Sequence, residues 1–303
     1  MMTKKSVAII GCGRVGSNLA FSLWKTKKYA IRALIDTQLS VAGALAGRTE
    51  CPVYSVSINS IPDEPLLILI ATPDDAINDV AKNLAARTDF EFSRCLVAHT
   101  SGALSSDILQ PLAEKGAKIA SLHPVQSFSK FEQQPTSLKN LYFGIEAAPD
   151  VAIEIDSIIK DLGGRAVHIA PEMKAFYHLA CAITSNFSVT LLYIALNILQ
   201  FTGIDKAIAA KILEPLVSTT LQNIAESSPE AALTGPIVRG DIETITKHLN
   251  ALKSEFPEFA ACYVQLAKIT NKIGFDAQRI TKAQSDNLVD LINQFSKSEG
   301  VFK

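Results

Sequence analysis

A glycine-rich motif near the N-terminus has the clearest chemical meaning in this sequence. It follows an apolar run at residues 7–10 and reads Gly11-Cys12-Gly13-Arg14-Val15-Gly16. In G-x-G-x-x-G motifs the first glycine permits a tight turn, the second lets the backbone approach a pyrophosphate, and the third lets helix and strand pack closely. The N–H groups at the start of the following helix bind the phosphates. The whole motif is therefore a predicted dinucleotide site.

Asp36 ends a second apolar run, 20 positions after the last glycine of the motif (36 − 16). A carboxylate at this place accepts hydrogen bonds from the adenosine ribose and repels the 2′-phosphate of NADP. Asp36 therefore favours NAD over NADP.

Two histidines stand where predicted strands end. His99 leads into Thr100-Ser101-Gly102, and His123 precedes Pro124. Open parallel sheets bind ligands outside the carboxyl ends of their strands, and imidazole exchanges protons near neutral pH. We interpret His123 and Ser101 as catalytic candidates, with His99 and Ser101 as substrate contacts. The alternative is that His99 caps a loop and Pro124 holds His123 in a structural turn.

A third candidate group opens the helical part of the chain. Lys174, His178 and Ser185 lie at i, i+4 and i+11 on one helical stripe, and Asn186 lies about 100° further round the axis. Lys174 and His178 are expected to face the cleft at the solvated end of this helix, where an ammonium could orient a carboxylate or move a proton. We interpret both as catalytic candidates, with Ser185 and Asn186 as substrate contacts. Alternatively, Lys174 is only a solvated residue of the first turn.

Arg239 lies in a segment whose glycines and proline predict an irregular loop, Thr234-Gly235-Pro236-Ile237-Val238-Arg239-Gly240-Asp241. Its guanidinium could bind a substrate carboxylate or phosphate, or form a salt bridge within the loop. Asp241 is expected to N-cap the next helix.

The apolar patterns predict two domains that position these residues. Strand-like runs occur at residues 7–10, 31–36, 66–71, 96–99, 118–123, 141–146 and 166–169. They alternate with helical patterns at about 14–26, 74–87, 105–115 and 150–162. Later helical patterns cover about 171–202, 205–228, 241–254, 257–272 and 277–298, with breaks at Gly203, Ser228-Pro229, Pro257 and Gly274. We expect an α/β domain at residues 1–170, a Rossmann-type, doubly wound and mostly parallel sheet, followed by an all-helical substrate and dimerisation domain at 171–303.

Residues 175–204 contain no charged side chain. A hydropathy criterion alone would accept this stretch as a transmembrane helix. Its polar residues, among them His178, Thr184 and Asn197, and the lack of a flanking basic cluster argue instead for a central helix. Neighbouring helices or another subunit must cover such a helix. We therefore expect no membrane contact and a homodimer that shares it.

The composition excludes several function classes. A net charge of −1 gives no basic surface for nucleic acid. The five cysteines are widely spaced without a C-x-x-C pair, so we expect neither a disulfide framework nor a metal site. No apolar signal segment precedes the first strand, so we expect a cytoplasmic location.

These motifs resemble a family of uncharacterised Rossmann-like oxidoreductases that have a helical C-terminal domain of unknown function and are relatives of the deazaflavin-dependent NADP oxidoreductases. The resemblance rests on the glycine motif, Thr72-Pro73-Asp74-Asp75 after residues 66–71, His99-Thr100-Ser101-Gly102, Ser121-Leu122-His123-Pro124 and the loop at 232–241. It implies the fold and a dinucleotide cofactor. It also implies that Ala71, Thr72 and Pro73 border that cofactor.

More distantly, the chain is similar to prephenate dehydrogenases, in which the histidine of a His-Pro motif contacts the substrate hydroxyl. His123 matches that histidine and Ser101 matches a serine of the preceding turn, but the glycine and acidic residues usual beyond the His-Pro pair are absent. Lys174 and His178 resemble the Lys-x-x-x-Asn helix of β-hydroxyacid dehydrogenases and ketopantoate reductases, with His in place of Asn. Thr37 stands where relatives that use NADP carry an arginine.

The sequence therefore predicts an NAD(P)-dependent dehydrogenase or reductase. It would transfer a hydride between NAD or NADP, with NAD favoured, and a small carboxylated substrate in the cleft between the sheet and the helices. His123, or Lys174 with His178, would handle the proton on the substrate oxygen. A catalytically silent dinucleotide-binding or sensor protein stays the alternative, because a fold does not imply a reaction.

Overall fold

The computed structural model describes residues 4–63, 67–128 and 136–299. The chain divides into two compact units, Met1–Ser188 and Val189–Lys303. The long helix α6 (Lys174–Phe201) contributes residues to both units. The expected domain boundary at residues 170 and 171 lies just before this helix and stays a prediction.

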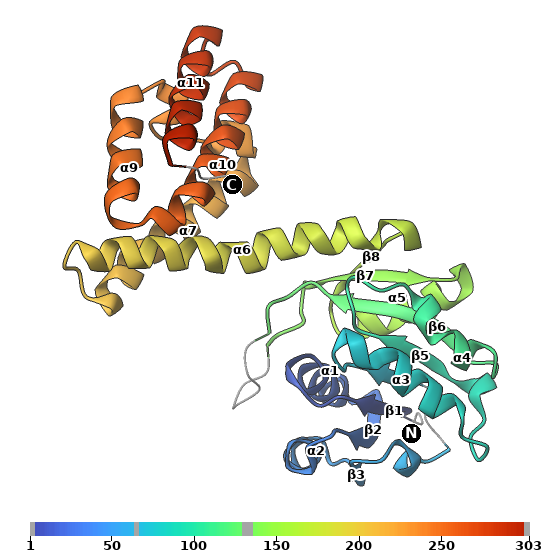
Figure 1. The fold of residues 1–303 in the computed structure, drawn as a ribbon. Helices are drawn as coiled ribbons and strands as arrows, with labels where there is room; N and C mark the ends of the chain where they lie inside the picture. Colours follow the sequence, from blue (N-terminus) through green and yellow to red (C-terminus); the bar gives the residue numbers. More distant parts are fainter. Residues whose placement is uncertain (1–3, 64–66, 129–135, 300–303) are drawn as a thin grey trace. The chain divides into compact units, whose positions relative to one another are not determined.

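An eight-stranded sheet forms the centre of the first unit, in the order β3-β2-β1-β4-β5-β6-β7-β8 (Figure 1). Its strands are β1 (Lys5–Ile10), β2 (Tyr29–Ile35), β3 (Val53–Ser55), β4 (Leu67–Ile70), β5 (Leu96–His99), β6 (Lys118–Pro124), β7 (Tyr142–Ala147) and β8 (Arg165–His168). Neighbours from β3 to β6 are parallel, β7 runs antiparallel to β6, and β8 is parallel to β7. The predicted doubly wound, mostly parallel sheet is confirmed.

Helices cover both faces of this sheet. They are α1 (Arg14–Lys25), α2 (Leu39–Thr49), α3 (Asp74–Ala85), α4 (Gln110–Ala113) and α5 (Pro149–Asp161), with short 3₁₀ turns η1 (Ile58–Ser60), η2 (Phe92–Arg94), η3 (Ser106–Leu109) and η4 (Pro171–Met173). Side chains alternate between the two faces of a strand. Val7 and Ile9 of β1 therefore share a core cluster with residues of α1, α2 and α5, whereas Ala8 and Ile10 share one with residues of α3 and α4.

Two elements of this unit, α2 and β3, were not predicted from the sequence patterns. The helix α2 contains Gly43 and Gly47, which lower helix propensity, and β3 has only three residues. The pattern at 105–115 forms the two short elements η3 and α4 instead of one helix. Leu66, at the start of one expected strand, lies outside the described residues.

The second unit is helical, as the sequence predicts. Besides part of α6 it contains α7 (Lys206–Glu226), α8 (Pro229–Ala232), η5 (Ile237–Arg239), α9 (Ile242–Glu255), α10 (Pro257–Asp276) and α11 (Lys282–Glu299). Its core joins residues of α9, α10 and α11, among them Leu249, Val264 and Ile292. The predicted stop at Gly274 is wrong, because α10 continues to Asp276. The last helix begins at Lys282, later than the pattern at 277 suggests.

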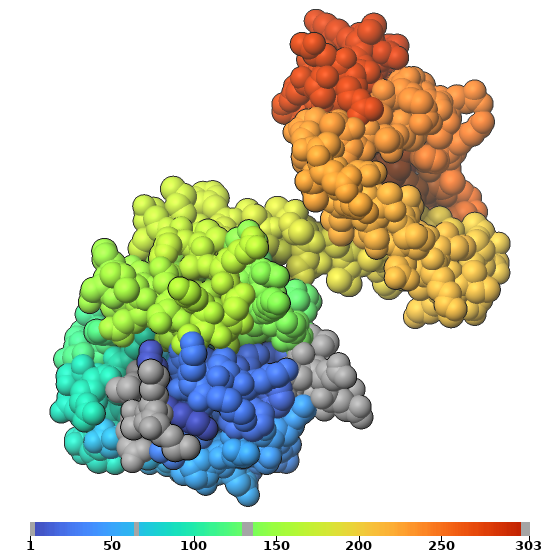
Figure 2. All heavy atoms as spheres, turned by 180° about the vertical axis from the view of Figure 1, so that it is seen from behind, coloured from blue at the N-terminus to red at the C-terminus, as the bar shows by residue number. Residues whose placement is uncertain are grey.

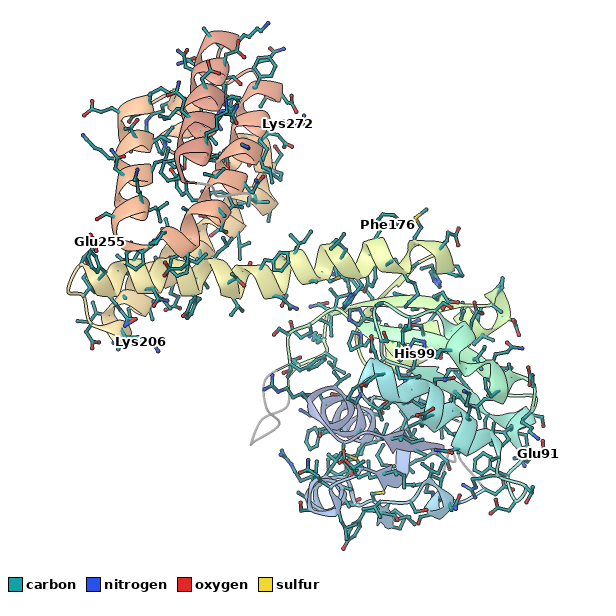
Figure 3. The ribbon with its side chains drawn as sticks, in the orientation of Figure 1. Glu91, His99, Phe176, Lys206, Glu255 and Lys272 are labelled. Carbon is teal, nitrogen blue, oxygen red and sulfur yellow. The ribbon has the colours of Figure 1, made fainter. Side chains whose placement is uncertain are left out.

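The helices α6 and α7 carry much exposed apolar surface. Lys174 is the buried residue of α6. The exposed large hydrophobic side chains of the two helices are Phe176, Leu179, Ile183, Phe187, Val189, Leu191, Tyr193, Phe201, Ile208, Ile212, Leu216, Leu221 and Ile224. Figure 3 labels Phe176, which is 69% exposed, and the yellow segments of Figure 2 show surface formed by these helices. The segment Pro171–Phe201 is long and apolar enough, by length and composition alone, to cross a membrane.

Candidate functional site

The glycine motif forms a tight turn between β1 and α1. Gly11 has a φ of +92°, which side-chain-bearing residues rarely adopt. A Cβ at Gly16 would overlap the carbonyl oxygen of Gly11, so only glycine permits the close approach of α1 to the turn. At Gly13, by contrast, no atom lies within 4 Å of the position a Cβ would occupy. The turn and packing roles are confirmed, and Gly13 leaves its side of the turn open.

The N-terminus of α1 is suited to an anion. Gly13 is its N-cap residue, no side chain caps the helix, and the first turn carries no acidic residue. The first N–H groups of a helix lack partners within the helix and lie at the positive end of its dipole. Together with the open space at Gly13, they form the kind of cradle that binds phosphate groups.

The carboxylate of Asp36 is fixed against the glycine turn. Its Oδ2 accepts a hydrogen bond from the Cys12 N–H at 2.7 Å, and its Oδ1 accepts one from the Gln38 N–H at 2.9 Å. Each oxygen keeps a further lone pair for another donor. Burial, with the charge of Asp36 adding to it, raises the pKa of the Cys12 thiol to about 12. Cys12 therefore supports the turn through its backbone, and its thiol is inert.

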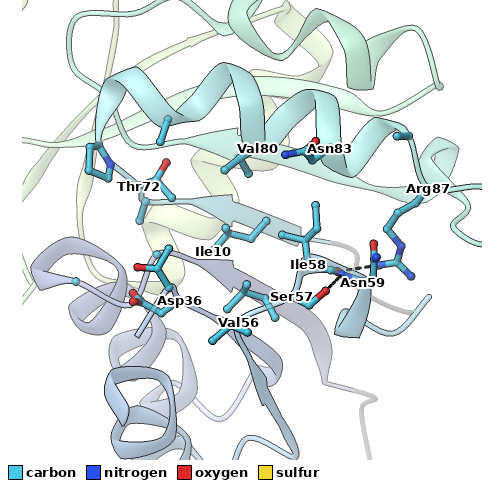
Figure 4. A pocket seen from close by; sticks show the side chains of 18 of the residues that line it. Ile10, Asp36, Val56, Ser57, Ile58, Asn59, Thr72, Val80, Asn83 and Arg87 are labelled. Carbon is cyan, nitrogen blue, oxygen red and sulfur yellow. Dashed lines mark hydrogen bonds between the residues drawn. The ribbon is translucent and has the colours of Figure 1, made fainter. Parts of the chain in front are cut away.

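A cavity of about 1080 Å³ extends from this turn along the end of the sheet (Figure 4). Asp36 and Thr72 lie toward one end and Asn59 and Arg87 toward the other. Val80 of α3 stands opposite the segment after β3. Of the predicted cofactor residues, those that line the cavity are Gly11, Gly13, Asp36, Ala71, Thr72 and Pro73. Cys12, Arg14, Val15 and Gly16 instead complete the turn and the start of α1.

One polar atom of this cavity wall is unsatisfied. The Thr72 side-chain oxygen is buried and makes no hydrogen bond within the part of the chain that the structure describes. Buried polar groups in native proteins nearly always have a partner. The orphaned hydroxyl is therefore consistent with a polar ligand bound against Ala71-Thr72-Pro73.

A second cavity, of about 550 Å³, lies between the end of β6 and the first half of α6. Four of the predicted residues line it together, namely His123, His178, Ser185 and Asn186. The two imidazole rings meet edge to face with centroids 6.1 Å apart. Gly102 lies against both rings, because a Cβ there would crowd His178 and His123. We call this the histidine cavity.

His123 is held neutral in its surroundings. Its pKa is lowered to about 4, mainly by burial and to a smaller extent by the nearby His178 and Lys174, while Asp74 opposes the shift. Its Nδ1 lies 2.9 Å from the Tyr177 hydroxyl. A neutral imidazole both donates and accepts hydrogen bonds, so His123 is equipped to exchange a proton with a ligand.

Lys174 is buried against β6 and the loop after β5, where it is 1% exposed. Its Nζ donates a hydrogen bond of 2.6 Å to Ser121 Oγ and a longer one of 3.4 Å to the carbonyl oxygen of Ser101. Burial lowers the pKa of Lys174, against the opposing charges of Glu146 and Asp74. The expectation of a solvated Lys174 is wrong, because the start of α6 packs onto the strand ends. Lys174 is absent from the lining of the histidine cavity.

Ser101 and His99 both stabilise the loop after β5. Ser101 Oγ donates to Asp74 Oδ2 at 2.8 Å and accepts the N–H groups of residues 103 and 104. His99, which Figure 3 labels, is fully buried. Its Nδ1 accepts the Ser101 N–H, and its Nε2 lies against the Ser105 carbonyl oxygen. Burial lowers the pKa of His99 to about 4. These contacts favour the loop-capping alternative, and a substrate role for either residue stays a prediction.

Sequence reasoning gave no site role to four polar residues of this region, namely Asp74 and Ser121, which it named only within motifs, and Glu146 and Tyr177. Glu146 accepts hydrogen bonds from both the N–H and the hydroxyl of Ser106, which ties the loop after β5 to β7. A carboxylate inside an expected strand, at 141–146, was a usable signal of a buried partner. Tyr177 directly precedes His178, but only the fold brings it to His123.

Arg239 belongs to the second unit. Its guanidinium lies 4.0 Å from Asp241, which agrees with the loop-internal salt bridge left open by the sequence. Asp241 N-caps α9 by accepting the Thr244 N–H at 3.0 Å, as predicted. A substrate role for Arg239 stays a prediction.

Comparisons with known families divide the chain in two. Residues 1–124 match a Rossmann-like domain, and residues 141–270 match a domain of unknown function, DUF2520. No curated protein matches the sequence.

Solved structures share this fold at low sequence identity. A Bacteroides fragilis protein assigned as an NADP oxidoreductase is 23% identical, with 88% of this chain and 98% of that chain covered and a TM-score of 0.75. A Thermotoga maritima protein is 24% identical, with 90% of this chain and 99% of that chain covered and a TM-score of 0.68. A prephenate dehydrogenase from A. aeolicus is 18% identical, with 89% of this chain and 98% of that chain covered and a TM-score of 0.54.

Proposed function

We propose that this protein, which pairs a Rossmann-like domain with the DUF2520 domain, is an NAD(P)-dependent oxidoreductase that acts on a small molecule. One observation carries the proposal: the side of Gly13 that would meet a pyrophosphate is open, and it faces the cavity that also holds Asp36. Two of the structural neighbours are named as an NADP oxidoreductase and as a prephenate dehydrogenase in complex with NAD⁺.

The residues of the larger cavity fit a nicotinamide dinucleotide. The glycine turn and the N-terminus of α1 would hold the pyrophosphate, and Asp36 would hold the adenosine ribose. The bound cofactor would supply or accept the hydride. Because Asp36 is already anchored by two backbone N–H groups, it cannot readily turn away from a 2′-phosphate. We expect NAD to bind more tightly than NADP, by on the order of tenfold.

The histidine cavity would hold the substrate. His123 would exchange the proton of the reacting oxygen or nitrogen, beside His178. Ser185 and Asn186 would supply hydrogen bonds to the remainder of the molecule. Lys174 would act on this cavity through Ser121 and through its charge, since it does not line the cavity itself. A cleft between the two domains, and a carboxylate on the substrate, stay predictions.

We also propose that the protein is a cytoplasmic homodimer. The exposed apolar side chains of α6 and α7 make up a surface too large to leave in water. The polar residues within α6, such as Thr184, Ser188 and Asn197, favour a protein partner over lipid. A second copy of the chain would cover these helices symmetrically.

A turnover screen tests the proposed activity. The purified protein is mixed with NAD or NADP, in both redox states, and with panels of hydroxy acids, keto acids and imines while nicotinamide absorbance is followed. Once a substrate is found, His123→Asn should lower the rate by about 10²–10⁴-fold, as the loss of a proton-transfer group does. Its affinity for the dinucleotide should be unchanged.

The control is His168→Asn, which alters a half-exposed histidine on β8 and should keep full activity. Dinucleotide binding without turnover of any compound would favour the silent sensor. Full activity in His123→Asn together with none in Lys174→Ala would move the proton path to Lys174.

A further inference from the structure

Tyr177 connects three elements around His123. It projects from α6 onto β7, where a Cβ on Gly144 would overlap its hydroxyl group. Its Oη lies 2.9 Å from Nδ1 of His123, at the end of β6. The two rings meet edge to face, with centroids 5.6 Å apart and planes at 88°. Gly144 is paired with His123 in the sheet register, so the absence of a side chain there makes room for the phenol.

The direction of this hydrogen bond follows from the charge states of the two groups. Burial raises the pKa of Tyr177, with Cys181 adding to the effect, and burial lowers the pKa of His123 to about 4. Both groups are therefore neutral at pH 7. A neutral imidazole has one N–H and one acceptor nitrogen. A phenol is the stronger hydrogen-bond donor and an imidazole nitrogen the stronger acceptor, so the pair is most stable with the Tyr177 hydroxyl donating to Nδ1.

That direction leaves the histidine proton on Nε2. For Nε2 of His123 the described residues provide no hydrogen-bond partner. His99 offers an internal comparison, because its Nδ1 accepts a backbone N–H, which can only donate. His99 is therefore also an Nε2–H tautomer, but its Nε2 proton is used by the Ser105 carbonyl. Of the two, only His123 keeps its N–H available.

We propose that Tyr177 is a positioning residue that fixes His123 as the Nε2–H tautomer, so that the histidine cavity presents a neutral hydrogen-bond donor. This proposal rests on the proposed function and specifies the ligand that the cavity takes: a group that accepts a hydrogen bond, such as a carbonyl oxygen or an imine nitrogen. A neutral imidazole can polarise such a group without carrying a charge of its own. The proposal concerns binding and orientation, and no bond is made or broken by Tyr177.

The tautomer can be measured directly, without substrate or dinucleotide. Protein labelled with ¹⁵N-histidine is studied at pH 7 by two-dimensional NMR that correlates ring nitrogens with ring carbon-bound protons, which distinguishes the protonated from the bare nitrogen. The His123 signals are assigned by their loss in His123→Gln. We expect a bare Nδ1 and a protonated Nε2 for His123, as for His99.

Tyr177→Phe keeps the ring against Gly144 and removes only the hydroxyl. We expect His123 to become a mixture of tautomers in this variant while His99 keeps its pattern. Tyr142→Phe is the control, because the Tyr142 hydroxyl bonds Arg165 at the surface and should leave His123 unchanged. The ring-nitrogen protonation of the neighbouring histidines, above all His178, is followed in the same spectra.

Two results would overturn the proposal: an Nδ1–H tautomer for His123 in the unmodified protein, or an unchanged His123 tautomer in a folded Tyr177→Phe variant. The first result is decisive even where the variant fails to fold. Failure of NAD to bind would contradict the proposed function but would not alter these spectra. Failure of the proposed function can therefore be distinguished from failure of the proposed role of Tyr177.

Discussion

At the scale of single residues, the histidines at the two strand ends differ in how many of their nitrogens are engaged. His99 uses both ring nitrogens within its own loop, whereas His123 uses Nδ1 alone. Both are buried enough that the folded protein disfavours their charged forms. His99 therefore stabilises its loop, whereas His123 lines a cavity, although both histidines stand at the end of a strand in the sequence.

This burial predicts acid sensitivity. The pKa of His99 falls from 6.5 to about 4 on folding, so the unfolded chain binds the proton more tightly. Stability is therefore complete above about pH 6.5 and declines as the pH falls toward 4, by about 3 kcal/mol for this residue. Urea unfolding at pH 7 and at pH 4.5 measures the loss. His99→Gln, which cannot titrate, should show a smaller loss, whereas His168→Gln at the surface should match the parent; equal losses in all three would refute this origin.

At the scale of elements, the packing of α1 onto the glycine turn depends on one missing side chain. Gly16→Ala would place a Cβ on the Gly11 carbonyl oxygen. The Gly11 carbonyl oxygen and the Gly16 Cα are both parts of the backbone and cannot move on their own, so the whole of α1 must shift. We therefore expect a loss of about 3 kcal/mol in the free energy of unfolding. Denaturant titration checks this value.

Gly47→Ala in α2 provides the matched control. No atom lies within 4 Å of the added Cβ, and the site is an exposed helical position. Alanine should stabilise the protein by about 0.5–1 kcal/mol there. If both substitutions had the same effect, the close approach of α1 to the turn would not be the cause.

The elements that could be predicted from sequence are those with a strong local pattern. The buried runs of β1 and β4, the glycine turn and the cap at Asp241 are visible because each depends on neighbouring residues. The helix α2 is not visible, because its glycines oppose its helical pattern and only packing on the sheet stabilises it.

In the candidate site, too, features set by local sequence could be predicted, and features set by packing could not. The position of His123 at a strand end, and that of His178, Ser185 and Asn186 on the first half of one helix, could be predicted from sequence. That these two sets line one cavity required the fold. Burial of Lys174 could not be predicted, because it depends on how α6 begins against β5 and β6. The pairing of Tyr177 with His123 joins residues 54 positions apart and likewise requires the fold.

At the scale of the whole molecule, the uncovered helices α6 and α7 predict a dimer. Light scattering at micromolar concentration should give twice the chain mass of 32.6 kDa. Leu216→Lys places a charge on α7 at a side chain that is 64% exposed, and should shift the protein toward monomer. Ile153→Lys on α5, at a side chain that is 71% exposed, is the control and should leave the dimer intact. A monomer in the unmodified protein would refute the dimer.

The central claim is that the cavity beside the glycine turn binds a nicotinamide dinucleotide. Calorimetric titration of NAD into the unmodified protein and into Gly13→Val tests it most directly. The valine would fill space in which nothing now lies within 4 Å of its Cβ, on an extended backbone with φ −66° and ψ −161°. We therefore expect an unchanged melting temperature and at least a tenfold loss of NAD affinity, about 1.4 kcal/mol or more. Absence of NAD and NADP binding in the unmodified protein, or equal NAD affinity in the two proteins, would contradict the account.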